Sequence, residues 1–125
     1  MPVISSRIDP SAADFAETRA ANLELLGQFE DLMAQSRAGG GEKYVKRHHD
    51  RGKLMVRERI ELLLDRDSPF FELSPLAAQG TQFPLSASAV TGIGVVNGVE
   101  VAISGHDPTI RGGASNPISL SKTLR

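Results

Sequence analysis

The sequence predicts an α/β fold in which a helical entry segment is followed by a β-hairpin. Between residues 15 and 33, apolar side chains recur at spacings of three and four, which is the period of one face of a helix. Farther along, Asn97-Gly98 separates two apolar runs, which is typical of a two-residue hairpin turn of type I′. The length of 125 residues suits one modest domain or a piece of a larger one.

The composition excludes several classes of protein. With 14 basic and 15 acidic residues, the net charge is -1, so no overall field attracts nucleic acid or an anionic membrane. The lack of cysteine excludes disulfides, zinc ribbons and a thiol nucleophile. Apolar runs such as residues 62–64 are far shorter than the roughly 20 residues that span a bilayer, and the start has no apolar signal core. We expect a cytoplasmic protein that binds neither nucleic acid nor membrane.

The first helix is expected to begin near Ser11, because Ser11 and Asp14 have the spacing of a capping box. Its apolar stripe runs from Phe15 to Met33, with charged residues on the remaining faces. Three consecutive glycines, residues 39–41, are expected to end it, since each costs about 1 kcal/mol relative to alanine in a helix.

The middle of the chain predicts a second helix and a short strand. Residues 56–64 place apolar side chains on one side and most charged ones on the other, which favours a helix. After a turn at residues 65–69, residues 70–73 are expected to form a short strand. Residues 74–87 contain Pro75, Gly80 and Pro84, which interrupt the segment too often for a long helix or strand.

The hairpin prediction fixes a register. If Asn97 and Gly98 are the loop residues, Val96 pairs with Val99, and Gly92 and Gly94 leave gaps on the apolar face. Other side chains must fill those gaps. An isolated hairpin is marginal in water, and the sequence contains no other strong strand to complete the sheet.

The end of the chain predicts a last helix. Asn116-Pro117 supplies an N-cap and a first-turn proline, and residues 119–125 then have helical character. Leu120 and Leu124 begin an apolar stripe that nothing continues, so we expect a truncated element.

A cluster of basic residues between residues 42 and 59 is the first candidate site. One interpretation is a phosphate or nucleic-acid patch. The other, which we favour, is a glycine-flanked basic loop that is solvated or pairs with acids of neighbouring subunits, since Tyr44 is the only interleaved aromatic. His48 and His49 are adjacent, a spacing that does not favour a metal site. The seven cations of the cluster are Lys43, Lys46, Arg47, Arg51, Lys53, Arg57 and Arg59.

The second candidate is the loop of residues 106–116, where a strand leads through Gly112-Gly113 to a helix start. Exposed backbone amides beside Arg111 are suited to hold an anion or an acyl carbonyl oxygen. The alternative is a tight connection in which the glycines only permit positive φ or close packing. The sequence does not decide between these two interpretations.

Several motifs occur in an order that resembles the start of the carboxyltransferase (β) subunit of biotin-dependent acyl-CoA carboxylases. They cover nearly everything after residue 39, and the stretches 112–117 and 122–125 are more similar to the methylcrotonoyl-CoA type than to the propionyl-CoA type. One departure is Met55-Val56, where many relatives have a threonine-containing helix start, so an N-cap is lost. The motifs are GGGEKYVKRHHDRGKL, RERIELLLD, SPFFEL, TGIG and DPTIRGG.

The resemblance implies a crotonase-like fold, of which residues 39–125 would start the carboxyltransferase domain after a lead and amphipathic helix in residues 1–38. It implies transfer of a carboxyl group from carboxybiotin, carried by a biotin carboxylase and biotin carrier α subunit, to an acyl-CoA. It also implies an oligomer of β subunits and no metal in this half-reaction. Relatives are several times longer and carry their catalytic amides beyond residue 125, so this chain alone is expected to contain no catalytic residue and to be inactive.

Within this interpretation, cations and free amides near the last loop are expected to lie along the acyl-CoA path, because they suit phosphate and thioester oxygens. The alternative is a small interaction module without enzymatic activity, whose helix and basic loop bind a partner. An autonomous module should cover the apolar surface of its hairpin and last helix, whereas a fragment should expose it. The expected acyl-CoA residues are Arg111, Gly112, Gly113, Lys122 and Arg125.

Overall fold

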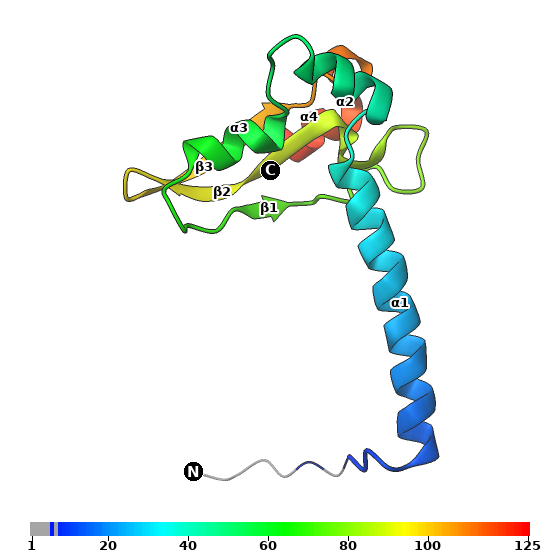
Figure 1. Ribbon diagram of the computed structural model, residues 1–125. Coiled ribbons are helices and arrows are strands. Elements are labelled where there is room, and N and C mark those ends of the chain that lie inside the picture. The colour runs from blue at the N-terminus through cyan, green and yellow to red at the C-terminus, as the bar shows by residue number, and fades with distance from the viewer. Residues whose placement is uncertain (1–5, 7) are drawn as a thin grey trace. The chain divides into compact units, whose positions relative to one another are not determined.

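The computed structural model describes residue 6 and residues 8–125, which divide into two compact units, Met1–Leu32 and Met33–Arg125. Figure 1 shows the element order. Two short 3-10 turns, Leu85–Ser88 and Arg111–Gly113, accompany the regular elements. Those elements are α1 (Ala13–Arg37), α2 (Glu42–His49), α3 (Val56–Leu63), β1 (Phe71–Leu73), β2 (Ala89–Val96), β3 (Val99–His106) and α4 (Pro117–Thr123).

Helix α1 begins differently from the prediction. Asp9 Oδ1 accepts hydrogen bonds from the Ser11 N–H at 2.9 Å and from its hydroxyl at 2.7 Å. These bonds hold the pKa of Asp9 below its usual value. Asp14 instead accepts a hydrogen bond from the Phe15 N–H. The predicted capping box of Ser11 and Asp14 is therefore wrong, because the carboxylate of Asp9 is the stronger acceptor and engages Ser11.

The apolar residues of α1 do not form a single stripe. Leu23 and Leu25 are two positions apart, which is about 200° around a helix, and both are about half exposed. The predicted end is confirmed, since the helix stops at Arg37 and Gly39 adopts a φ of +66°. In the last turn, Ser36 is buried and its hydroxyl donates to the Pro75 carbonyl at 2.7 Å.

The basic segment after the glycines is helical, so the expected basic loop is wrong there. Helix α2 places Glu42 in its first turn, and Lys46 and Arg47 in its last turn. This arrangement stabilises a short helix, because a negative side chain lies at the positive end of the helix dipole and positive side chains lie at its negative end. Lys46 and Asp50 add an exposed i,i+4 ion pair at 2.9 Å.

Helix α3 forms where the sequence predicts it, and a glutamate side chain takes the place of the missing N-cap. The predicted helix is confirmed as Val56–Leu63. Met55 supplies no capping oxygen, but its N–H donates to Glu58 Oε2 at 2.7 Å, and this bond, together with His49, lowers the pKa of Glu58. A side chain three residues into the helix thus satisfies the first amide.

The sheet contains three antiparallel strands in the order β1-β2-β3. The predicted hairpin register is confirmed, with Val96 opposite Val99 and Gly92 opposite Ile103. Asn97 and Gly98 both have positive φ, as a type I′ turn requires. The predicted strand near residue 70 is confirmed as β1, which pairs with β2 and extends the hairpin.

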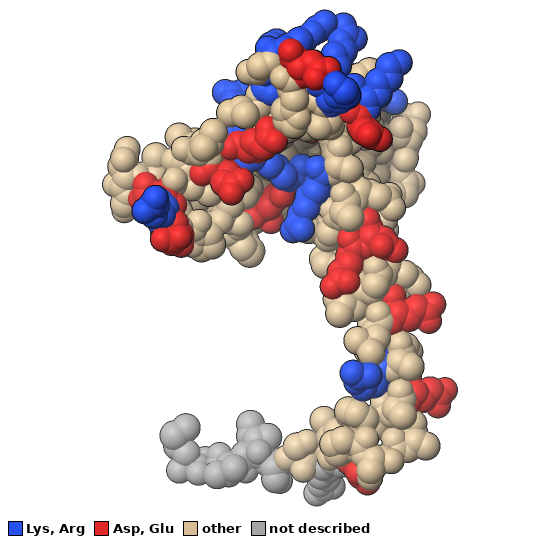
Figure 2. Space-filling view, in the orientation of Figure 1, with Lys and Arg blue, Asp and Glu red and all other residues tan. Residues whose placement is uncertain are grey.

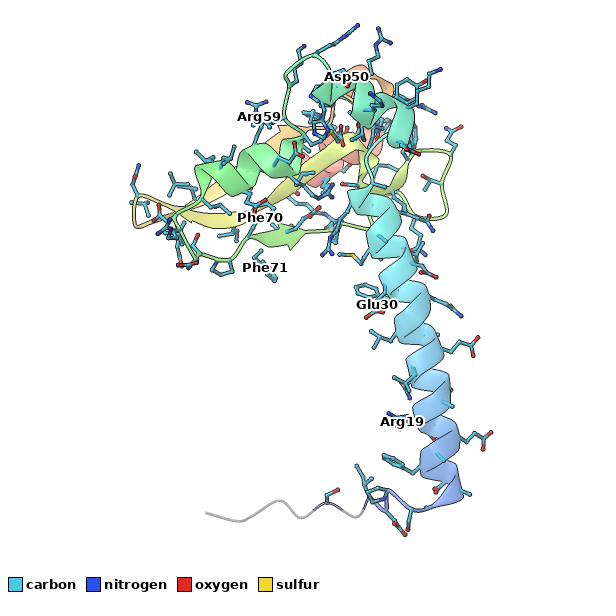
Figure 3. The ribbon with its side chains drawn as sticks, in the orientation of Figure 1. Arg19, Glu30, Asp50, Arg59, Phe70 and Phe71 are labelled. Carbon is cyan, nitrogen blue, oxygen red and sulfur yellow. The ribbon has the colours of Figure 1, made fainter. Side chains whose placement is uncertain are left out.

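Large side chains fill the glycine gaps in the hairpin, as the sequence required. The ring of Phe70 occupies the space beside Gly92, the Leu64 side chain lies beside Gly94, and a Val56 methyl lies 2.6 Å from where a Cβ of Gly105 would be. Phe70 packs on the buried cluster of Val56, Ile60 and Val90, whereas the adjacent Phe71 is 67% exposed (Figure 3). The small core therefore lies between α3 and one face of the sheet.

An acidic residue outside the hairpin holds its turn. The two carboxylate oxygens of Asp65 accept hydrogen bonds from the backbone N–H groups of Asn97 at 2.6 Å and Gly98 at 2.7 Å. The N–H of Asp65 donates in turn to the Val95 carbonyl at 2.9 Å. The segment after α3 is thus joined to the tip of the hairpin.

Candidate functional site

A groove of about 610 Å³ lies between α2 and the loop that joins β3 to α4. We call it the cationic groove. The two walls come from parts of the chain that are about 60 residues apart, one from the basic cluster and one from the glycine-containing loop. The structure thus brings the two candidate sites of the sequence together. The residues that define the groove are Gly40, Tyr44, Arg47, Arg51, Arg111 and Gly112.

A chain of hydrogen bonds fixes the two walls relative to each other. Asp107 is buried, and its Oδ1 accepts from the N–H of Thr109 at 2.8 Å and from the Thr109 hydroxyl at 2.6 Å. The Thr109 hydroxyl oxygen accepts from the N–H of Gly40 at 2.9 Å. A Cβ at residue 40 would overlap the Thr109 carbonyl, so only glycine permits this approach.

The charge of the groove is positive and not neutralised by the described residues. Arg47, Arg51 and Arg111 are exposed and take part in no ion pair among residues 6 and 8–125. Two nearby acids are engaged elsewhere, Asp50 with Lys46 and Glu58 with His49. Figure 2 shows Lys and Arg side chains gathered over α2, at the top of the view.

The loop after β3 combines both interpretations that the sequence left open. Gly112 and Gly113 have φ of +69° and +80°, and Arg111 also has positive φ, so a tight connection is present. Arg111 and Gly112 nevertheless line the groove, with the Arg111 side chain exposed. Gly113 donates its N–H to the Ile110 carbonyl at 2.9 Å, so its amide is engaged within the turn. Arg125 is exposed and does not line the groove.

Lys122 lies away from the groove. Its side chain is 8% exposed, and its Nζ donates to the Ala89 carbonyl at 2.6 Å and to Ser86 Oγ at 3.3 Å. Burial lowers the pKa of Lys122 to about 8, although nearby Glu72 opposes this shift. The structure therefore gives Lys122 buried partners of its own, distinct from the other cations predicted along the acyl-CoA path.

Lys122 and the N-cap of α4 hold a turn of unusual conformation. Ser86, Ala87 and Ser88 are buried and have φ of 65°, 53° and 61°, a left-handed region that costs about 1–2 kcal/mol per non-glycine residue. Asn116 donates from Nδ2 to the Ala87 carbonyl at 3.0 Å, and its Oδ1 caps α4 as predicted. The sequence offered no signal for this turn, because three consecutive left-handed residues without glycine are rare.

A third ion pair connects three elements. Arg57 binds Glu72 through two hydrogen bonds, of 3.1 Å from Nε and 2.7 Å from Nη2, and both side chains are largely shielded. Its Nη1 donates to the Ser36 carbonyl at 3.2 Å. One cation of the basic cluster is thus structural and connects α3, β1 and the last turn of α1.

Other kinds of site are absent from the described part of the chain. In residue 6 and residues 8–125, no group of three or more His, Asp or Glu side chains is placed to hold a metal ion. His48 Nε2 lies 3.2 Å from the Leu54 carbonyl, and His49 contacts Glu58. Among the same residues, no helix combines the length and apolar character that crossing a membrane demands.

Comparison with known proteins decides the family. The carboxyl transferase domain matches residues 47–125. This chain belongs to that family. The fold class is accordingly the expected one: the first elements of a crotonase-like carboxyltransferase domain, helices followed by an antiparallel sheet. The methylcrotonoyl-CoA and geranyl-CoA proteins described next confirm the resemblance found in the sequence.

Relatives of this carboxyltransferase segment include two beta subunits of Mycobacterium tuberculosis. A probable biotin-dependent acyl-coenzyme A carboxylase beta2 subunit is 54% identical over 123 residues, which are 98% of this chain and 23% of that protein. A biotin-dependent 3-methylcrotonyl-coenzyme A carboxylase beta1 subunit is 41% identical over 127 residues, 100% of this chain and 23% of that protein. The chain therefore spans about a quarter of the length of these relatives.

Solved structures share the arrangement. The beta subunit of geranyl-CoA carboxylase from P. aeruginosa superposes with a TM-score of 0.87 at 35% identity, over 98% of this chain and 23% of that one. Transcarboxylase 12S, whose structure shows a hexamer, superposes with a TM-score of 0.73 at 29% identity, over 81% of this chain and 21% of that one. The carboxyl transferase domain match begins at residue 47. It therefore includes Arg47, Arg51 and the loop at Arg111, but not Gly40 or Tyr44 of the cationic groove.

Proposed function

We propose that this chain is the amino-terminal part of an acyl-CoA carboxylase carboxyltransferase subunit, of the methylcrotonoyl-CoA type. The observation that carries the proposal is the match along essentially the whole chain to subunits four times longer. The activity is transfer of a carboxyl group from carboxybiotin to an acyl-CoA. It belongs to the longer protein, and the chain alone is inactive.

The contribution of this segment is to bind the acyl-CoA. Arg111 and the Gly112 backbone line a groove of positive charge, which suits phosphate and thioester oxygens. Gly113 closes the turn of this loop. Lys122 acts at a distance: it holds the buried segment at residues 86–89, which hydrogen bonds to Ala114 and Asn116 join to the end of the loop. Arg125 follows α4 and is exposed, and we assign it to the same acyl-CoA path.

Biotin is proposed to reach the enzyme on a separate biotin carboxylase and biotin carrier α subunit. We assign no residue of this segment to biotin. We also propose that several β subunits assemble with one another and that the complex is cytoplasmic.

The exposed apolar surface favours this proposal over a small interaction module. Leu120 and Leu124 of α4 are 56% and 78% exposed, and Ile93 and Val99 of the hairpin are 44% and 60% exposed. An autonomous domain buries such side chains, whereas a segment of a longer fold leaves them for the rest of the chain.

A chimera tests the proposal. Residues 1–125 of this chain replace the matching segment of the 3-methylcrotonyl-CoA carboxylase beta1 subunit, with which they share 41% identity over 127 residues. The chimera, assembled with the cognate α subunit, is expected to carboxylate 3-methylcrotonyl-CoA. In the chimera, Arg111→Ala is expected to raise the KM for acyl-CoA about tenfold with little change in kcat. A folded, assembled but inactive chimera would contradict the proposal, and an unchanged KM would remove Arg111 from the acyl-CoA path.

A further inference from the structure

Helix α1 carries a repeating pattern that the carboxyl transferase domain match leaves out, because that match begins at residue 47. Six of its side chains recur at alternating spacings of three and four, which is the seven-residue period of helices that pack in pairs. Leu25 and Phe29 of this set are 62% and 49% exposed, and Leu23 lies outside it. We call the set the heptad face. Its members are Phe15, Thr18, Asn22, Leu25, Phe29 and Leu32.

The opposite side of α1 is acidic. Glu17, Glu24 and Asp31 each follow a member of the heptad face by two positions, which is about 200° around a helix. All three are exposed, and Figure 2 shows acidic side chains along α1. Charged groups on this side gain from contact with water, whereas the apolar groups of the heptad face do not. The heptad face is therefore the side that a partner covers.

Two more charges border the heptad face and select the partner. Arg19 and Glu30 are eleven residues apart, so about 20° separates them around the axis and they lie on the same flank (Figure 3). Neither forms an ion pair in the part of the chain that the structure describes. A complementary partner needs an acid near Arg19 and a cation near Glu30. A second copy of α1 that runs in the opposite direction supplies both.

The heptad face also sets the register of such an antiparallel pair. When Phe15 packs beside Leu32 of the second copy, every other member of the face meets a member in turn. Arg19 then lies within about 3 Å, measured along the axis, of the level of Glu30 of the second copy, which its long side chain can reach. In a parallel pair the same flanks lie on opposite sides of the pair, so these charges do not meet.

The polar members of the face fit inside the antiparallel pair. Asn22 Nδ2 donates to the Thr18 carbonyl at 2.8 Å, so its own helix satisfies one of its donors. In the antiparallel register, Asn22 lies beside Leu25 of the second copy, near the middle of the interface. One asparagine at such a position fixes the register at a cost in affinity. The pair is therefore specific rather than strong.

We propose that the heptad face of α1 binds the same face of a second copy of this chain, with the two helices antiparallel. The interface is symmetric, so each copy contributes Arg19 to one ion pair and Glu30 to the other. Pairing joins two subunits through a segment that precedes the matched domain. It needs neither carboxyl transfer nor acyl-CoA, so an inactive chimera would refute the proposed function and leave the pairing intact.

Disulfide trapping tests the direction of the pair. The sequence has no cysteine, so each introduced thiol is the only one in its chain. When Phe15→Cys and Leu32→Cys chains are mixed and oxidised, a disulfide between the two kinds of chain is expected. Either variant alone is expected to stay unlinked, because its two thiols lie about 25 Å apart and a disulfide needs Cα atoms within about 7 Å. Links in either variant alone, or none in the mixture, would overturn the proposal.

Charge reversal tests whether the partner is a second α1. The dimer Kd is measured by sedimentation equilibrium in chains that also carry Leu120→Gln and Leu124→Gln, so that the exposed leucines of α4 add no second contact. Glu30→Arg is expected to raise this Kd about tenfold, since two ion pairs become repulsions. Addition of Arg19→Glu is expected to restore it. Glu24→Arg is the matched control, because it makes the same change of charge on the acidic side of α1 and is expected not to weaken pairing.

The outcomes separate this partner from others. Equal effects of Glu30→Arg and Glu24→Arg would reduce the interaction to net charge and overturn the proposal, as would a double variant that does not recover the original Kd. Circular dichroism of each variant checks that α1 is retained. The link between residues 15 and 32 is also expected in the chimera. Protection of both thiols there without a link would assign the heptad face to another part of the longer subunit and overturn the pairing.

Discussion

At the scale of single residues, Lys122 is the side chain whose environment departs most from sequence expectation. It was predicted along the acyl-CoA path, but its ammonium lies in a nearly dry site with one short bond to a carbonyl. Spacing along a helix places Lys122 on a face, and it does not reveal which faces the rest of the chain covers. The spacing of Lys122 between Leu120 and Leu124 is the same whether the lysine contacts solvent or the core.

The lowered pKa of Lys122 predicts a change of stability with pH. The folded state loses the proton near pH 8, whereas the unfolded chain keeps it to about 10.5, so the unfolded state binds more protons between these values. The free energy of unfolding therefore gains a contribution as pH rises through this window, of at most about 3 kcal/mol.

Comparison with Lys122→Met isolates this contribution. Denaturant unfolding of both proteins at pH 7.5 and pH 10 is expected to give a stability difference that shifts toward the lysine protein at the higher pH. Other titrating groups are common to both chains and cancel. Parallel pH profiles would show that the amine of Lys122 keeps its ordinary pKa.

At the scale of elements, the hairpin depends on a carboxylate that is outside it. Asp65 accepts from two backbone amides of the turn, and one of its partners is 32 residues away in sequence. Removing an acceptor of two short bonds costs about 1–2 kcal/mol. Asp65→Ala is therefore expected to lower the free energy of unfolding by that amount and to speed hydrogen exchange at residues 95–101.

Glu100→Ala is the control for this prediction. Glu100 is an exposed acid of β3 that makes no side-chain hydrogen bond among the described residues, so its loss is expected to change stability by less than about 0.5 kcal/mol. If both substitutions had the same small effect, the bonds from the turn to Asp65 would contribute nothing to the hairpin.

Elements that follow from local chemistry were predictable, and those that depend on distant partners were not. Asn97-Gly98 alone fixed the hairpin register, because the turn type demands positive φ at both positions. Asn116-Pro117 located the start of α4 for a similarly local reason. Helix α2 was missed because it is only two turns long, although Glu42 at its start and cations at its end were a readable signal.

The candidate site could be predicted only in halves. The sequence singled out the basic cluster and the loop at Arg111, but their meeting depends on Gly40 lying against Thr109, a contact across 69 residues. Nothing in either segment specifies that partner. The division proposed at residue 38, with a lead and helix before it and the carboxyltransferase domain after it, stays a prediction.

At the scale of the whole molecule, the balance of buried and exposed apolar side chains predicts the behaviour of the isolated chain. Its buried cluster consists of Val56, Ile60 and Val90, while Leu120 and Leu124 are exposed. Exposed apolar surface of this kind binds hydrophobic dyes and promotes self-association. The chain alone is expected to enhance the fluorescence of anilinonaphthalene sulfonate and to sediment as a mixture of species.

Substitution of the exposed leucines tests this expectation. Leu120→Gln with Leu124→Gln is expected to reduce dye binding and self-association without loss of helix content, because neither side chain contributes to the core. Dye binding that is unchanged in this variant would show that α4 is not the exposed apolar surface in solution.

The side chains that fill the spaces beside the hairpin glycines have an evolutionary consequence. A Cβ at position 94 would meet the Leu64 side chain, so these two sites are free to change only as a pair. In an alignment of homologues, an alanine or larger residue at position 94 is expected to accompany a smaller residue at position 64. Position 92 should stay glycine, because a Cβ there would meet the backbone carbonyl of Phe71 as well as the Phe70 ring. Covariation would thus trace the contact between the sheet and the chain that covers it.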